Sequence, residues 1–253
     1  MQLIDSHCHL DDLRFDADRA AVLTRAADHG VDTFIVPAVL RSGWPKLRDL
    51  AATYQQRTIY PAYGLHPWFC HLHSDDDLAL LPDYLQQAVA IGECGLDGAH
   101  GKSPEHEQLH WFRAQLDLAL SMQLPVIIHA CRAVDTVSRE IRLRPGLSGV
   151  VHGFAGSAQQ AGALIAQGFY LGIGSSITYA KNRRLQEIVS EMPLERLLVE
   201  SDAPDQPPST HKGRRNEPAF LLEIVRQIAT LRAADTQVIA DQCNRNVREL
   251  FRL

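Results

Sequence analysis

Leu3-Ile4-Asp5-Ser6-His7-Cys8-His9 is a short apolar strand that runs into two histidines, and this pattern is repeated along the chain. Side chains at positions i and i+2 of a strand point the same way, so His7 and His9 can direct their imidazoles at one point. Two convergent imidazoles at a strand end are how a protein begins a metal site. Taken alone, the pair could equally be two solvated histidines, and the rest of the chain distinguishes the two interpretations.

Eight short apolar segments recur, and helix-like amphipathic stretches lie between them. They span residues 3–7, 33–37, 59–65, 90–92, 126–128, 149–151, 169–173 and 197–199. The segments are rich in β-branched residues and do not alternate between polar and apolar, as expected of parallel strands buried on both faces. Eight β-then-α units predict an α/β protein, a (β/α)8 TIM barrel formed by residues 1–253 as a single domain. A doubly wound open sheet is the alternative, but no Gly-x-Gly-x-x-Gly follows the first strand.

Composition narrows the class of protein further. The 253 residues are 45% hydrophobic and 22% charged, an ordinary balance for a globular core, and the net charge of −5 argues against a basic surface for bulk nucleic-acid binding. The five scattered cysteines include no Cys-x-x-Cys pair, so a disulfide framework or a cysteine zinc cage is not expected. Neither a membrane-spanning run nor a secretory signal is visible, which predicts a cytoplasmic protein without a membrane partner. No obligate protein partner is evident.

Polar residues stand where most of the predicted strands end. In a barrel of this type the active site lies at the carboxyl ends of the strands, so these side chains should meet at one opening. Each of them alone could be a polar residue where a strand meets water, but a closed barrel brings the whole set together. The residues are His7, His9, His66, Glu93, His129, His152 and Asp202.

All of these except His66 form a set of four imidazoles and two carboxylates, which predicts a metal site. A catalytic zinc usually takes three protein ligands and a water, so six ligands suit two divalent ions that share a carboxylate. Glu93, on the fourth strand, is the carboxylate that we expect to bridge the ions. The mixed donor set is compatible with Zn, Mn, Fe, Ni or Co, and less comfortably with Mg.

With these residues in these positions, the chain resembles the TatD family of metal-dependent deoxyribonucleases, within the amidohydrolase-like barrel hydrolases. The resemblance spans nearly the whole chain and lies in the motifs Asp5-Ser6-His7-Cys8-His9-Leu10, Gly64-Leu65-His66-Pro67, Ile91-Gly92-Glu93-Cys94-Gly95-Leu96-Asp97, Leu124-Pro125-Val126-Ile127-Ile128-His129, His152-Gly153-Phe154-Ala155-Gly156-Ser157, Glu200-Ser201-Asp202-Ala203-Pro204 and Asn216-Glu217-Pro218.

The resemblance implies two divalent metals and hydrolysis of phosphodiester bonds, typically in DNA by a 3'-5' exonuclease-like activity on single strands. It implies that one ion is held by His7, His9, Glu93 and Asp202 and the other by Glu93, His129 and His152. The chain departs from the usual family pattern at four positions, which puts the substrate preference in question and leaves the metal ligands intact. These positions are Gly98, Gly153, Ala155 and the segment Ala203-Pro204-Asp205-Gln206 that follows Asp202.

Roles in catalysis follow as hypotheses. Two close metals can hold the attacking and leaving oxygens of an in-line displacement and can activate a bound water. Asp202 is expected to hold and deprotonate that water, beside the bridging Glu93, and His66 to donate a hydrogen bond to a phosphate oxygen or the leaving group. Arg132, Arg214 and Arg215 are candidates for binding phosphate, although basic clusters are more often solvated surface.

Two other functions remain open from the residues alone. A small-molecule amidohydrolase or esterase shares the barrel and the opening His-x-His, but many such enzymes bridge their metals with a modified lysine where this chain has Glu93. A non-catalytic metal-binding barrel would need a missing ligand, and none is missing. The substrate is left as DNA, RNA or a small phosphodiester.

Overall fold

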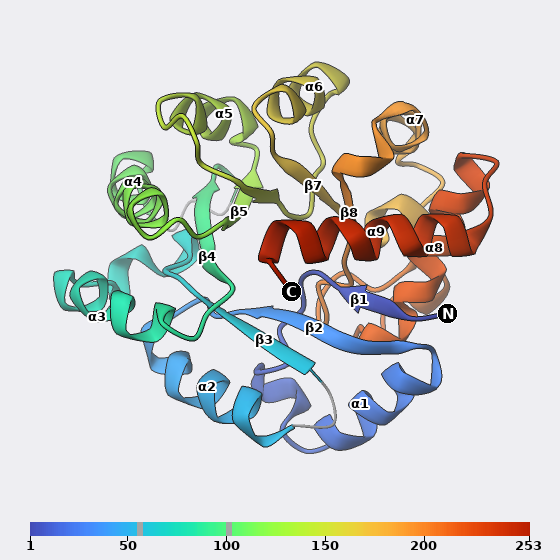
Figure 1. Ribbon diagram of the computed structural model, residues 1–253, viewed down its shortest axis with the longest axis horizontal. Coiled ribbons are helices and arrows are strands. Elements are labelled where there is room, and N and C mark those ends of the chain that lie inside the picture. The colour runs from blue at the N-terminus through green and yellow to red at the C-terminus, as the bar shows by residue number, and fades with distance from the viewer. Residues whose placement is uncertain (55–57, 100–102) are drawn as a thin grey trace.

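The computed structural model describes residues 1–54, 58–99 and 103–253, and it contains one parallel sheet whose eight strands follow chain order. This confirms the predicted TIM barrel. Each strand pairs in parallel with the next, and helices surround the sheet (Figure 1). The strands are β1 (Leu3–Asp5), β2 (Val31–Pro37), β3 (Thr58–Tyr63), β4 (Ala90–Asp97), β5 (Val126–Cys131), β6 (Gly149–Val151), β7 (Tyr170–Ile173) and β8 (Leu197–Val199).

The first and last strands are joined by backbone hydrogen bonds that complete the barrel. Ser6 donates its N–H to the carbonyl of Val199 at 3.1 Å, and Asp202 donates its N–H to the carbonyl of His7 at 2.9 Å. Both bonds lie beside predicted metal ligands, so the barrel closes at the place where the site is expected.

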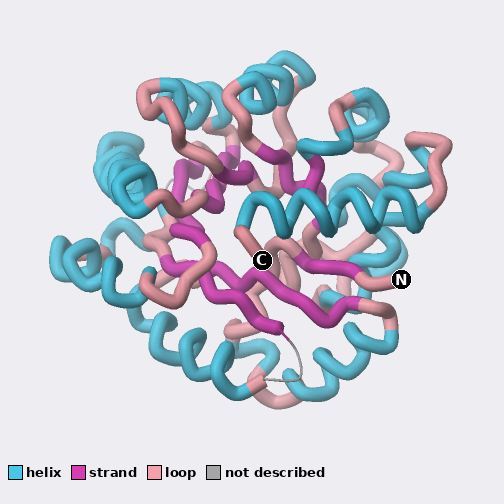
Figure 2. The backbone as a smooth tube through the Cα atoms, viewed as in Figure 1, coloured by secondary structure: helices cyan, strands magenta, loops and turns pink. Residues whose placement is uncertain are grey.

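Helices lie outside the sheet between successive strands, as the β-then-α pattern predicts (Figure 2). Across the described ranges, none of them is long and apolar enough to cross a membrane. The α-helices are α1 (Arg19–Asp28), α2 (Trp44–Thr53), α3 (Asp75–Leu85), α4 (Glu105–Met122), α5 (Val134–Arg142), α6 (Ala158–Ala166), α7 (Arg183–Glu191), α8 (Leu221–Leu231) and α9 (Thr236–Phe251).

Apolar side chains fill the interior of the barrel. α9 lies across one end of it (Figure 1). One buried cluster takes a residue from each strand, from Ile4 on β1 to Leu198 on β8, and adds Val247, Leu250 and Phe251 from α9. Burying this much apolar surface is the main favourable contribution to folding. Because apolar residues close the amino-terminal end of the barrel, the polar side chains gather at the carboxyl ends.

β4 is longer than the sequence pattern predicts. We expected a strand over residues 90–92, but β4 continues to Asp97 and stays paired with β5, after a register shift between Ile91 and Cys94. At Gly95, with φ of +140°, a Cβ atom would lie 2.0 Å from the carbonyl oxygen of His129, so only glycine allows the two strands to approach. Glu93 therefore lies within the strand, not at its end.

Candidate metal centre

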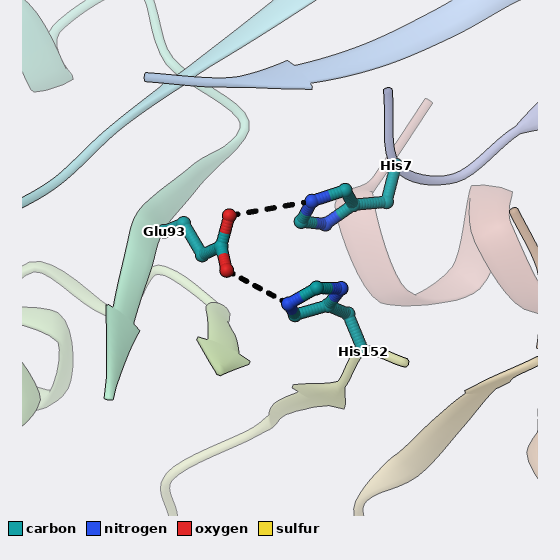
Figure 3. Close-up of side chains that lie close together, drawn as sticks. All are labelled: His7, Glu93 and His152. Carbon is teal, nitrogen blue, oxygen red and sulfur yellow. Dashed lines mark ion pairs between the residues drawn. The ribbon is translucent and has the colours of Figure 1, made fainter. Parts of the chain in front are cut away.

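Glu93 stands at the centre of the site, with its two carboxylate oxygens facing different imidazoles (Figure 3). Its Oε2 lies 3.4 Å from Nε2 of His7 and 3.5 Å from Nε2 of His9. Its Oε1 lies 2.7 Å from Nε2 of His152 and 3.0 Å from Nδ1 of His129. The carboxylate thus separates two pairs of histidines, which we call the Oε2 cluster and the Oε1 cluster.

Asp202 completes the Oε2 cluster. Its Oδ1 lies 3.6 Å from Nε2 of His7 and 3.6 Å from Nε2 of His9. The backbone of Asp202 is left-handed, with φ of 55°, a conformation that aspartate tolerates better than most residues. The Gln206 amide donates a hydrogen bond to the other oxygen, Oδ2, so Oδ1 is left to face the histidines.

These donor atoms suit divalent cations. Nε2 of His7 and Nε2 of His9 face each other at 3.3 Å, beside one oxygen each from Glu93 and Asp202. Nδ1 of His129 and Nε2 of His152 are likewise 3.3 Å apart, beside Glu93 Oε1. Facing imidazole nitrogens next to a carboxylate are the donors that Zn, Mn, Fe, Ni or Co prefer, so the residues fit metal ions at both clusters.

The predicted ligands come from strands that are far apart in sequence. His7 and His9 follow β1, Glu93 lies on β4 and His129 on β5, while the other two come within three residues of the ends of their strands. The last two are His152, after β6, and Asp202, after β8. The structure therefore brings all six predicted ligands to one opening, and their role in binding metal stays a prediction.

Burial and the surrounding histidines oppose each other at Glu93. Burial alone raises the pKa of its carboxyl, but the surrounding histidines, His152 foremost, hold that pKa well below its usual range. Glu93 is thus ionised and ready to accept a cation between the imidazoles. The ring of His7 also stacks on that of His152, with 3.9 Å between centroids, which fixes both rings.

His66 lies against the Oε1 cluster. Its Nε2 is 3.1 Å from Glu93 Oε1, and its Nδ1 accepts the backbone N–H of Trp68. Burial lowers the pKa of His66 to about 4, so the ring is neutral with its proton on Nε2. The predicted donor hydrogen therefore exists, and here it is directed at Glu93.

A cavity of about 670 Å³ adjoins the Oε1 cluster and includes Arg132 among its lining residues. Within the described residues, the Arg132 guanidinium makes no hydrogen bond or ion pair, and its backbone is left-handed with φ of 51°. Gly153, Ala155 and Gln206 also line the cavity. Three of the four departures from the family pattern thus surround one opening beside the predicted metal ligands.

The other two predicted phosphate ligands are placed differently. Arg215 is engaged with carboxylates: it pairs with Asp18 at 2.7 Å and Glu217 at 3.0 Å, and it lies over the ring of Phe15. Arg214 is exposed to solvent. These contacts favour a structural role for Arg215, and phosphate binding by either residue stays a prediction.

Sequence reasoning missed three polar residues behind the predicted ligands. Asp97 accepts a hydrogen bond from His129, Glu200 lies 3.6 Å from His152, and Gln206 donates to Asp202. A signal existed for Asp97, because residues i and i+4 of a strand share a face and Asp97 is four residues beyond Glu93. It was overlooked because the strand was predicted to end before it.

A (β/α)8 barrel that gathers imidazoles and carboxylates at the carboxyl ends of its strands defines a metal-dependent hydrolase. A family model described as TatD related DNase matches residues 4–252. The chain therefore belongs to the TatD-related DNase family, as its motifs predicted.

Relatives of this chain match it over nearly their whole length. The uncharacterized metal-dependent hydrolase YjjV of Escherichia coli is 37% identical over 99% of this chain and 98% of its own. The 3'-5' ssDNA/RNA exonuclease TatD of Erwinia billingiae is 33% identical, with 99% of each chain covered. The crystal structure of the Escherichia coli YjjV protein superposes with a TM-score of 0.94 at 35% identity, covering 99% of this chain and 98% of that one.

Proposed function

We propose that this protein is a phosphodiesterase that uses two divalent ions to degrade single-stranded nucleic acid from its 3' end. The observation that carries the proposal is the position of Glu93, whose oxygens face separate histidine pairs at 2.7 to 3.5 Å. A carboxylate between two imidazole pairs is the arrangement expected of a bridging ligand in a two-metal site. His7, His9 and Asp202 would complete one ion's ligands, and His129 and His152 the other's.

Bound ions would neutralise charge on the phosphodiester and lower the pKa of an attacking water. The remaining work falls to the side chains. Asp202 is suited to accept the proton of that water, because its Oδ1 faces the Oε2 cluster while Gln206 holds its Oδ2. His66 carries a hydrogen on Nε2 and is suited to donate it to a phosphate oxygen once substrate draws that hydrogen away from Glu93.

The cavity beside the Oε1 cluster is the proposed place for the end of a nucleic-acid strand. Its volume of about 670 Å³ is ample for one nucleotide, and Arg132, which has no ion pair with any described residue, lines it together with Arg184. Guanidinium groups match the oxygens of phosphate, so both arginines can hold a phosphate next to the one that is cleaved. The exonuclease names of relatives such as the Erwinia billingiae protein support this substrate class.

The test is an assay of full-length protein stripped of metal and then reloaded separately with Mn, Zn, Co or Mg. Substrates are a 5'-end-labelled single-stranded oligonucleotide, the same oligonucleotide with a phosphorothioate 3' end, bis-p-nitrophenyl phosphate, and a panel of cyclic amides and lactones. We expect a ladder that shortens from the 3' end of the unmodified strand, slower attack on the blocked strand, and loss of both with EDTA.

Other outcomes would redirect the assignment. Turnover of a cyclic amide or lactone without any phosphodiester cleavage would make the protein a small-molecule amidohydrolase or esterase. Cleavage of bis-p-nitrophenyl phosphate but not of the oligonucleotide, made as DNA and as RNA, would limit it to small phosphodiesters. Inactivity toward every substrate with every ion would indicate a barrel that binds metal without catalysis.

A further inference from the structure

We propose that Asp97 and Glu200 are positioning residues that act together on one ion only, the ion of the Oε1 cluster. Each is a buried carboxylate directly behind a predicted histidine ligand, Asp97 behind His129 and Glu200 behind His152. The inference rests on the proposed two-ion centre. It goes beyond the ligand set because it makes the two ion positions chemically different.

Asp97 determines which nitrogen of His129 faces Glu93. Its Oδ2 lies 2.8 Å from Nε2 of His129, while Nδ1 on the other side of the ring lies 3.0 Å from Glu93 Oε1. An ionised carboxylate only accepts hydrogen bonds, so the ring proton must be on Nε2 and the lone pair on Nδ1. A hydrogen bond of this kind also makes the imidazole a stronger metal ligand.

Asp97 is itself held in place. Its Oδ2 also accepts the indole N–H of Trp68 at 2.7 Å, and its Oδ1 accepts the backbone N–H of Ala99 at 2.7 Å. Two N–H donors on Oδ2 use the lone pairs that a metal would need. Asp97 is therefore better suited to support His129 than to serve as a ligand, although Asp97, His129 and Cys131 lie close enough together to hold an ion.

Glu200 occupies the corresponding place behind His152. Its Oε1 accepts the backbone N–H of Gly153 and lies 3.6 Å from Nδ1 of His152. The fold makes room for this carboxylate at Gly172, where a Cβ atom would come within 2.2 Å of Glu200 Oε2. With Nδ1 directed at Glu200, Nε2 of His152 is left facing Glu93 Oε1 at 2.7 Å.

In the described part of the chain, no carboxylate forms an ion pair with Nδ1 of His7 or His9 in the Oε2 cluster. Nδ1 of His9 lies 3.2 Å from the backbone carbonyl of Pro37, which is a neutral acceptor. Among the described residues, Nδ1 of His7 and Nδ1 of His152 both lack a hydrogen-bond partner, but only Nδ1 of His152 has a carboxylate beside it, Glu200 at 3.6 Å. Removing a carboxylate behind a ligand typically weakens metal binding about 10- to 100-fold. Loss of Asp97 or Glu200 should therefore weaken one ion and spare the other.

The experiment is calorimetric titration of Zn into metal-free, full-length protein, followed by the absorption spectrum of the Co-loaded form. The variants are Asp97→Asn, Glu200→Gln and Trp68→Phe. Matched controls are Asp77→Asn and Glu140→Gln, which alter equally buried carboxylates that pair with arginines away from the metal centre. Trp68→Phe leaves the Asp97 carboxylate in place, so it serves if Asp97→Asn does not fold.

We expect two ions in the wild-type protein and a loss of about 10- to 100-fold in the affinity of one of them in Asp97→Asn and Glu200→Gln. Trp68→Phe should weaken the same ion less, and the Co spectrum should change in all three variants but in neither control. Unchanged affinities, or equal weakening of both ions, would overturn the inference. A wild-type protein that binds one ion would contradict the two-ion proposal, and the positioning roles would then stand only if both variants weaken that ion.

Discussion

Asp5 accepts two hydrogen bonds from Ser201, one from its backbone N–H at 2.9 Å and one from its side-chain hydroxyl at 2.6 Å. The two residues are 196 positions apart in sequence, one on β1 and the other just after β8. Asp5 is two residues before His7, and Ser201 directly precedes Asp202. The pair therefore sets the spacing of two predicted ligands of the Oε2 cluster while it closes the barrel.

Ser201→Ala tests this closure. The substitution removes the hydroxyl that donates to Asp5, so one oxygen of this fully buried carboxylate loses its hydrogen-bond donor. We expect a loss of about 1–3 kcal/mol in the free energy of unfolding. Urea denaturation of the metal-free protein measures the change. Ser121→Ala is the control, because Ser121 is exposed and bonds only within its own helix, to Leu118. Equal stability of the two variants would show that the Asp5 contact contributes little.

Glu93→Gln should weaken both ions together, in contrast to the variants at Asp97 and Glu200. An amide keeps one oxygen and replaces the other with an NH2 group, which repels a cation, and both carboxylate oxygens face imidazoles here. We expect the affinity of each ion to fall at least about 10- to 100-fold, measured as metal content after dialysis. Retention of one ion at full affinity would contradict a bridging role.

Asp202→Asn separates catalysis from metal binding. The variant keeps four imidazoles and Glu93, so it should still bind metal, but it lacks the base that accepts the water proton. Loss of a general base typically lowers turnover about 100- to 10,000-fold. Steady-state kinetics on bis-p-nitrophenyl phosphate, with the metal content of each sample measured in parallel, tests this. Near-normal kcat in a metal-loaded sample would remove Asp202 from proton transfer.

The barrel could be predicted because its signal is repeated eight times along the chain. Buried parallel strands must be apolar on both faces, so each one is visible as a short run of β-branched residues. β4 was the exception: Glu93, Gly95 and Asp97 interrupt its apolar pattern, yet they remain paired with β5. β4, which carries the central carboxylate of the site, therefore has the least regular apolar pattern among the strands.

The ligands were also predictable, because imidazoles and carboxylates stand out where apolar strands end. Glu200 was not, since it reaches His152 through the fold. Gln206 was not either: it is only four residues beyond Asp202, but it lies outside any helix or strand whose period would place the two side chains together. The ion pair of Arg215 could not be predicted either, because its partner Asp18 lies far away in sequence, near the amino terminus. Sequence showed which residues can do chemistry, and the structure shows which of them already have partners.

Arg132 and Arg215 should therefore respond differently to substitution. Arg132 lines the cavity beside the metal centre without a described ion pair, whereas Arg215 is tied to Asp18 and Glu217. Each phosphate contact to a single strand adds about 0.7 to the slope of log affinity against log salt. Arg132→Gln should lower kcat/KM for a single-stranded oligonucleotide and reduce the salt slope by about this amount. It should leave kcat/KM for bis-p-nitrophenyl phosphate unchanged, because that substrate has no second phosphate.

Arg215→Gln is the control, and it should leave the salt slope unchanged and cost about 1 kcal/mol or less of stability. The opposite result, with the slope reduced only in Arg215→Gln, would move the phosphate site to the loop after β8 and away from the cavity.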